Sequence, residues 1–298
     1  MQLIRKVQED KSVTSSFRRA MIITIGGNIF FSAVKAYGAR VSGSVALYAD
    51  AANSISDVIY SVFLVIGLYL SLRPPDESHP QGHSRFEPLV GLVVALTMSF
   101  AGYEAARSSI ARFTAGGQVV EPSLPTIILI VSALIKFGMF LTIRNIARKV
   151  HSPALETTSL DHISDVLTST VAFIGILTSK INPLFDAVAG ILVAIWIFRA
   201  AFNAGKDHIS FLTGGGASKD LTDEIVRIAE TEPGVLKVHH IITEYVGPRL
   251  VVEMHVNVSG SMPLNEAHGI SDNIMAKIEA LPDVDRVYVH LEPDDWID

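Results

Sequence analysis

The segments Asn53-Ser-Ile-Ser-Asp57 and Asp161-His-Ile-Ser-Asp165 lie inside apolar stretches that are long enough to cross a membrane. Each segment carries two oxygen-bearing side chains four residues apart, which places both on one face of a helix. A charge at the centre of a bilayer costs about 2.5–3.5 kcal/mol, so the three aspartates cost on the order of 8–10 kcal/mol. Packing alone does not explain that cost, and the apolar opposite faces argue against soluble helices. The segments therefore predict a cation site inside a membrane.

The composition of the whole chain also indicates a membrane protein. Of 298 residues, 49% are hydrophobic and 18% are charged, and the mean hydropathy is +0.39. The net charge is +4 over residues 1–214 and −10 over residues 215–298. The negative charge of residues 215–298 argues against nucleic acid as a binding partner. The absence of cysteine excludes disulfides and thiolate metal sites.

Six apolar runs predict an all-α membrane bundle of six transmembrane helices within residues 1–208. The runs cover about 20–39, 44–72, 88–111, 124–146, 160–180 and 183–205. Lysine and arginine are concentrated before the first run, between the fourth and fifth runs, and after the sixth run. This bias predicts a multi-pass membrane protein with both termini in the cytoplasm. We expect the plasma (inner) membrane as its location.

The glycine-rich stretch Thr213-Gly-Gly-Gly-Ala217 predicts a flexible joint over residues 209–217, followed by a soluble domain at 218–298. Hydrophobic periodicity predicts helices at 219–230 and 265–281 and strands at 235–246, 250–258 and 285–291. This α-β-β-α-β order predicts a cytoplasmic α+β domain of ferredoxin-like or metallochaperone-like type. Helices would cover one face of its sheet, and a second copy of the chain could pair with the other face.

The predicted intramembrane site has an all-oxygen donor set, formed by Asn53, Asp57, Asp161 and Asp165. Hard divalent cations such as Mn²⁺ prefer oxygen, whereas imidazole and thiolate suit zinc and copper. His162 points about 100° away from Asp161 on a helix, and we expect it to make a helix–helix hydrogen bond instead. Lys136, near the middle of the fourth run, is expected to neutralise a carboxylate.

The clustering of these carboxylates also predicts proton coupling. Neighbouring carboxylates raise one another's proton affinity when the site is empty. An arriving metal ion would displace the protons, and its departure would let them return. The site therefore predicts exchange of metal for protons.

Two further groups of side chains are candidate metal ligands outside the membrane. Asp76, His79 and His83 lie in the loop between the second and third runs, where Pro80 and Gly82 interrupt any helix. The last domain is rich in imidazole and carboxylate groups, among them His239, His255, His268, His290 and Glu292. For both groups the alternative is a set of solvated surface side chains.

With these residues in place, the chain resembles the cation diffusion facilitator family over essentially its whole length. The resemblance rests on G-S-V-A-L-x-A-D-A-x-x-S-x-x-D at 43–57, H-P-x-G-H-x-x-x-E at 79–87, S-P-A-L at 152–155 and H-x-S-D at 162–165. Members are homodimeric exporters that exchange a divalent metal for protons and keep their soluble domain in the cytoplasm. The resemblance implies a transport site at the four oxygen donors, a second site in the loop and a third in the last domain.

The donor set also bears on which metal is carried. Zinc-type members usually carry histidine or aspartate at the position of Asn53 and histidine at the position of Asp161, so this chain is similar to manganese exporters. We therefore expect a Mn²⁺/H⁺ antiporter that works by alternating access. Metal would be its substrate and a candidate regulator, with no prosthetic group.

Several alternatives remain open. The same transporter could carry Zn²⁺ or Fe²⁺, a membrane metal sensor would bind without transporting, and a channel would show no proton coupling. An enzyme is not expected, since the sequence has no H-E-x-x-H motif and no nucleophile elbow.

Overall fold

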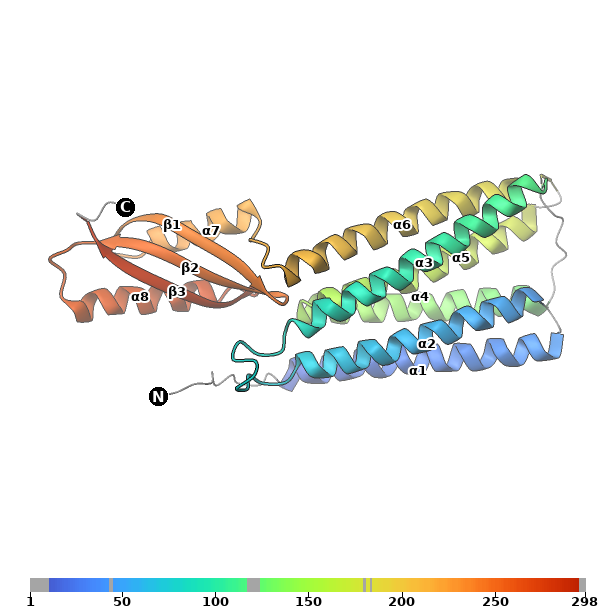
Figure 1. Ribbon diagram of the computed structural model, residues 1–298, viewed down its shortest axis with the longest axis horizontal. Coiled ribbons are helices and arrows are strands. Elements are labelled where there is room, and N and C mark those ends of the chain that lie inside the picture. The colour runs from blue at the N-terminus through green and yellow to red at the C-terminus, as the bar shows by residue number, and fades with distance from the viewer. Residues whose placement is uncertain (1–10, 43–44, 117–123, 179–180, 183, 295–298) are drawn as a thin grey trace. The chain divides into compact units, whose positions relative to one another are not determined.

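A computed structural model shows six long helices followed by a small α+β unit (Figure 1). It describes residues 11–42, 45–116, 124–178, 181–182 and 184–294. The long helices are α1 (Lys11–Ser42), α2 (Val45–Ser71), α3 (Phe86–Thr114), α4 (Leu124–Val150), α5 (Pro153–Thr178) and α6 (Leu184–Leu212). The chain divides into two compact units, Met1–His208 and Ile209–Asp298.

The six helices have the length that a membrane requires. They contain 26 to 32 residues, or about 39–48 Å at 1.5 Å per residue, against a hydrocarbon core of about 30 Å. Within the described residues, three segments are also apolar enough to span, namely Ser12–Tyr37, Phe86–Thr114 and Ile130–Val150. The predicted fold class, a helical membrane domain followed by an α-β-β-α-β domain, is confirmed.

Several helices extend beyond the apolar runs that predicted them. Helix α1, for example, begins at Lys11 rather than near residue 20. Helix α5 begins at Pro153 rather than near residue 160, because Ser152 caps it: the Ser152 hydroxyl accepts a hydrogen bond from the Leu155 N–H at 3.2 Å. Helix α6 continues to Leu212, four residues into the predicted joint, because the glycine run of the joint begins only at Gly214. Capping residues, rather than hydropathy, define these ends.

Glycines allow α3 and α6 to approach closely. A Cβ atom at Gly91 of α3 would lie 2.1 Å from the imidazole of His208 on α6. Farther along, a Cβ at Gly190 of α6 would lie 2.1 Å from the hydroxyl of Ser109 on α3. Small residues at such contacts are typical of helices that pack in membranes.

Gly91→Ala should therefore destabilise the bundle. The added methyl group must displace the buried His208 ring, and overpacking of this kind costs about 1–3 kcal/mol. Gly138→Ala is the matched control, because a Cβ there meets nothing within 4 Å. Thermal unfolding in detergent should show a lower midpoint for the first variant alone; equal midpoints for both would contradict the packing.

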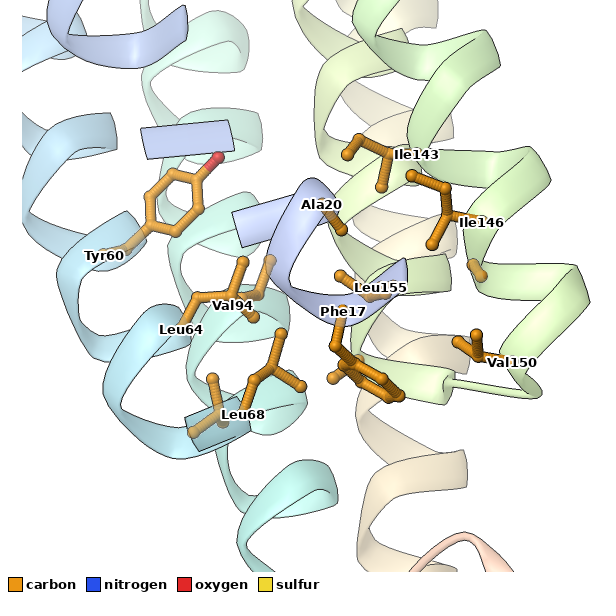
Figure 2. Close-up of a cluster of buried hydrophobic side chains, with 13 residues drawn as sticks. Phe17, Ala20, Tyr60, Leu64, Leu68, Val94, Ile143, Ile146, Val150 and Leu155 are labelled. Carbon is orange, nitrogen blue, oxygen red and sulfur yellow. The ribbon is translucent and has the colours of Figure 1, made fainter. Parts of the chain in front are cut away.

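A cluster of buried apolar side chains, here termed the apolar plug, packs between helices of the bundle (Figure 2). Its members are Phe17, Ala20, Tyr60, Leu64, Leu68, Val90, Val94, Ile143, Ile146, Ala147, Val150, Ala154 and Leu155. On α2 these residues follow Asp57, on α4 they follow Lys136, and on α5 they precede Asp161. The plug therefore lies between the intramembrane aspartates and the end of the bundle that carries the loop 72–85.

The second unit is a three-stranded sheet with two helices on one face. Its elements are α7 (Lys219–Glu230), β1 (Val235–Val246), β2 (Arg249–Val258), α8 (Leu264–Glu279) and β3 (Val284–Pro293). β1 pairs antiparallel and β3 parallel with the central strand β2. Alternate β2 side chains, among them Val252, Met254 and Val256, are buried against Ile225 of α7 and Ile274 of α8. The other residues of β2, including His255, lie on the opposite face.

Candidate transport and metal sites

The described intramembrane carboxylates gather around one lysine. Asp57 comes from α2, Asp161 and Asp165 come from α5, and Lys136 comes from α4. The Lys136 Nζ atom lies 2.6 Å from Asp165 Oδ2 and 3.4 Å from Asp57 Oδ2. It also donates a hydrogen bond to Asn28 Oδ1 on α1 at 3.1 Å. The lysine expected to neutralise a carboxylate thus contacts two of them, contributed by different helices.

Hydrogen bonds hold the remaining groups of this site in place. The Tyr60 hydroxyl donates a hydrogen bond to Asp161 Oδ2. Asp161 is buried, with 6% of its surface exposed. The Asn28 amide donates to the Ser61 hydroxyl at 2.8 Å, and Ser61 donates to the Asp57 carbonyl at 2.6 Å. Tyr60 and Ser61 were not singled out from the sequence, although their positions three and four residues after Asp57 place them on its helix face.

His162 lies closer to the aspartates than its sequence position indicates. One ring nitrogen and oxygens of Asp161 and Asp165 all lie within 4.8 Å of one another. The residue is fully buried, and neither ring nitrogen has a hydrogen-bond partner among the residues described. The helix–helix hydrogen bond expected for His162 is therefore not found there, and an imidazole is available beside the oxygen donors.

The fourth predicted ligand, Asn53, lies on α2, but its side chain is outside the described residues. A cavity of about 430 Å³ opens beside the described part of the site. Asp57, Asp161 and Asp165 line it together with apolar side chains of α2 and α3, such as Phe63 and Phe100. The carboxylates are therefore the polar part of an otherwise apolar cavity.

The loop between α2 and α3 brings its three predicted ligands together. Asp76 Oδ1 lies 3.4 Å from His79 Nδ1, and Asp76 Oδ2 lies 3.4 Å from His83 Nε2. His83 is buried, and its other ring nitrogen, Nδ1, lies 3.1 Å from the carbonyl of Pro74. That contact aims Nε2 at the carboxylate, an arrangement typical of metal-binding histidines.

Local hydrogen bonds hold Asp76 in its ionised form. The Ser78 hydroxyl and the His79 backbone N–H each donate to Asp76 Oδ1 at 2.7 Å. They lower the pKa of the exposed Asp76 carboxyl to about 2, with Ser78 making the larger contribution. Because the pKa is depressed, this carboxylate is charged throughout the neutral range and releases no proton when a metal binds.

Asp76→Asn should weaken metal binding by the loop by about tenfold, since one anionic ligand is lost. The loss should be the same at pH 6 and pH 8, because Asp76 is ionised at both values. Equilibrium metal binding to the full-length protein would measure this, with the exposed neighbour Glu77→Gln as the control. A deficit that disappears at pH 6 would show that Asp76 titrates in this range.

The soluble domain places four of its five predicted ligands together on the face of the sheet that lacks helices. Glu292 of β3 lies 3.0 Å from His239 Nε2 of β1, 3.0 Å from His255 Nδ1 of β2 and 3.5 Å from His290 Nε2. The strand register produces this cluster, because His255 pairs with His290. His268 is not part of it: this exposed residue lies on α8, 3.7 Å from Asp272.

Comparison with known proteins identifies this architecture. Residues 21–213 match the cation efflux transmembrane domain, and residues 217–294 match the cation efflux protein cytoplasmic domain. The chain therefore belongs to the cation efflux family, whose members are transporters rather than enzymes. It is a divalent cation efflux transporter, a multi-pass membrane protein with a cytoplasmic C-terminal domain.

Individual relatives cover nearly the whole chain. An uncharacterized transporter of Methanocaldococcus jannaschii is 34% identical over 92% of this chain and 97% of its own length. The manganese efflux system protein MneS of Bacillus subtilis is 29% identical over 91% and 94%. The cation-efflux pump FieF of Shewanella oneidensis is 24% identical over 85% of this chain and 86% of its own length.

A solved structure matches the soluble domain alone. A cadmium form of the MamM C-terminal domain is 27% identical over 26% of this chain and 98% of that chain, with a TM-score of 0.25.

Proposed function

We propose that this transporter exports Mn²⁺ in exchange for protons by alternating access. The observation that supports the proposal is that Asp57, Asp161 and Asp165, which come from two helices, line one cavity of the bundle. With the amide of Asn53 they supply only oxygen, the donor that Mn²⁺ accepts readily. Two relatives from Bacillus subtilis, MneS and MneP, are named as manganese efflux proteins.

The carboxylates supply the proton coupling. When the metal leaves, three acidic groups line a largely apolar cavity beside Lys136, and protons from the far side replace the lost positive charge. The transport cycle needs no prosthetic group. Both termini lie in the cytoplasm, because six crossings return the chain to the side on which it began, and the protein resides in the plasma (inner) membrane.

The active form is a homodimer that pairs through the soluble domain. The sheet face without helices carries the His239, His255 and Glu292 cluster and the half-exposed apolar side chains of Ile242 and Tyr288. The loop and tail clusters bind the same cation before transport and regulate it. His268, on the helical side of the domain, joins a metal site only through such an assembly.

Transport in proteoliposomes tests this function. A vesicle with an acidic lumen should accumulate Mn²⁺ faster than one without a pH gradient, and its lumen should lose protons as it does so. If the rate of Mn²⁺ transport did not depend on the pH gradient, antiport would be excluded and the protein would have to be a channel. Metal bound at a fixed number per protein, with none accumulated, would indicate a sensor.

Zn²⁺ is the second candidate substrate, and one observation favours it. The His162 ring nitrogen within 4.8 Å of the aspartates could provide the imidazole that zinc prefers. Uptake of Mn²⁺, Zn²⁺ and Fe²⁺ in competition on the purified protein would rank the three metals.

A further inference from the structure

Lys136 is a buried cation whose charged atom contacts the proposed transport site. The buried Lys35 of α1 also interacts electrostatically with Asp57 and Asp165. Lys136 lies midway along α4 and is only 4% exposed. Its Nζ atom contacts Asp165 at 2.6 Å, Asn28 at 3.1 Å and Asp57 at 3.4 Å. These three partners come from α5, α1 and α2, so the ammonium group joins the helices that form the site.

A metal ion at the proposed site would need the same oxygen atoms. Hard divalent cations bind oxygen at about 2.0–2.6 Å, so an ion on Asp165 Oδ2 would lie within about 5 Å of Nζ where it now stands. At that separation, in a cavity lined mostly by apolar side chains, the two positive charges repel strongly. The lysine and the ion cannot both bind the pair of carboxylates well.

We propose that Lys136 is a tethered competitor of the transported cation. In the metal-free site its ammonium group contacts Asp57 and Asp165 and compensates part of their negative charge. An arriving ion displaces it sideways, with its charge retained, and it returns as the ion leaves. Lys136 thereby weakens binding and promotes release. The inference rests on the proposed transport site.

Two groups on α1, the Phe31 ring and the Asn28 amide oxygen, could receive the displaced ammonium group. Lys136 Nζ already lies 5.9 Å from the centre of the buried Phe31 ring on α1, within the range of a cation–π contact. Asn28, one helical turn before Phe31, supplies a polar acceptor on the same side. Rotation of the flexible lysine stem toward α1 would leave the ammonium group between the Asn28 amide oxygen and the Phe31 ring while it frees both carboxylates.

Metal affinity of the full-length protein tests the proposal. Lys136→Met removes the charge and keeps an unbranched side chain, so the Kd for Mn²⁺ at the intramembrane site should fall at least about tenfold. Lys136→Arg keeps the charge and should stay near the parent value. Lys149→Met, an exposed residue on the same helix, controls for the loss of a positive charge. The intramembrane component is the binding that Asp57→Asn removes.

The readouts separate competition from other roles. In proteoliposomes Lys136→Met should lower both KM and kcat, since tight binding slows release. The Kd for Zn²⁺ should fall by the same factor as that for Mn²⁺, because a point charge acts on both alike. An unchanged or higher Kd in Lys136→Met, or a fall in Lys136→Arg as large as that in Lys136→Met, would overturn the proposal. If Asp57→Asn removes no binding, the transport site itself is wrong, whatever Lys136 does.

Folding is a separate measurement, because removing Lys136 leaves the carboxylates without their counter-charge. Without metal, Lys136→Met should unfold at a lower temperature than the parent, and saturating Mn²⁺ should raise its midpoint more than it raises that of the parent. If the methionine variant is not recovered, Lys136→Gln must show the same larger metal-induced shift. A shift no larger than that of the parent would overturn the proposal.

Discussion

Asp57→Asn is expected to reduce metal transport at least about a hundredfold, which would make it indistinguishable from empty vesicles in most assays. Asp57 is mostly buried, lies 3.4 Å from Lys136 and lines the cavity beside the site. The substitution retains the shape of the side chain and removes one of three negative charges. With one carboxylate fewer, the negative charge beside Lys136 would be too small to balance a divalent cation.

Glu104→Gln provides the matched control for this prediction. It makes the same chemical change in another membrane helix, at an exposed carboxylate that pairs with Arg107 at 3.5 Å. That variant should transport at close to the parent rate. The assay is Mn²⁺ uptake into proteoliposomes with equal amounts of folded protein. Comparable activity in the two variants would show that Asp57 does not carry the ion.

Asp161→His is expected to change the preferred metal, raising the ratio of zinc to manganese transport on the order of tenfold. The change replaces a hard oxygen donor by imidazole at a residue whose oxygen lies within 4.8 Å of an oxygen of Asp165. Asp161→Asn is the control, because it removes the carboxylate and supplies no imidazole. If Asp161→His keeps the parent ranking of metals, the argument from donor type is wrong.

Tyr60 complicates this experiment in a way that the structure makes testable. Its hydroxyl donates to Asp161 Oδ2 and could donate to the unprotonated nitrogen of a histidine placed there, which would mask that ligand. Combining Tyr60→Phe with Asp161→His removes the donor. The double variant should therefore favour zinc more strongly than the single variant. Competition uptake with both metals present measures each ratio directly.

The sequence predicted the fold well where a local pattern was sufficient. Spacing of four residues placed Asp161 and Asp165 on one face, and period-two alternation located β1 and β2 to within a residue. Helix ends were predicted less well: α5 begins at a proline and a serine cap, features that hydropathy does not measure.

The sites were predictable only in part, because contacts between helices depend on tertiary structure. The sequence could assign Lys136 a role as counter-ion but not its partners, which lie 79 and 29 residues away in Asp57 and Asp165. His162 was placed outside the site from its helical angle, yet its ring lies beside the carboxylates. The fifth tail residue, His268, was grouped with the others by composition alone.

The apolar plug has a consequence for the kinetics of transport. From Tyr60 to Leu68 on α2 it is about 12 Å deep. It lies toward the C-terminal ends of α2 and α4, which are on the same side of the bundle as the end of α6, and the cytoplasmic domain follows α6. No dehydrated divalent ion crosses such a layer at a useful speed. An ion loaded from the cytoplasm to the proposed site would have to wait until the helices that form the plug separate and water enters. The turnover number should therefore follow the rate of that separation and depend steeply on temperature.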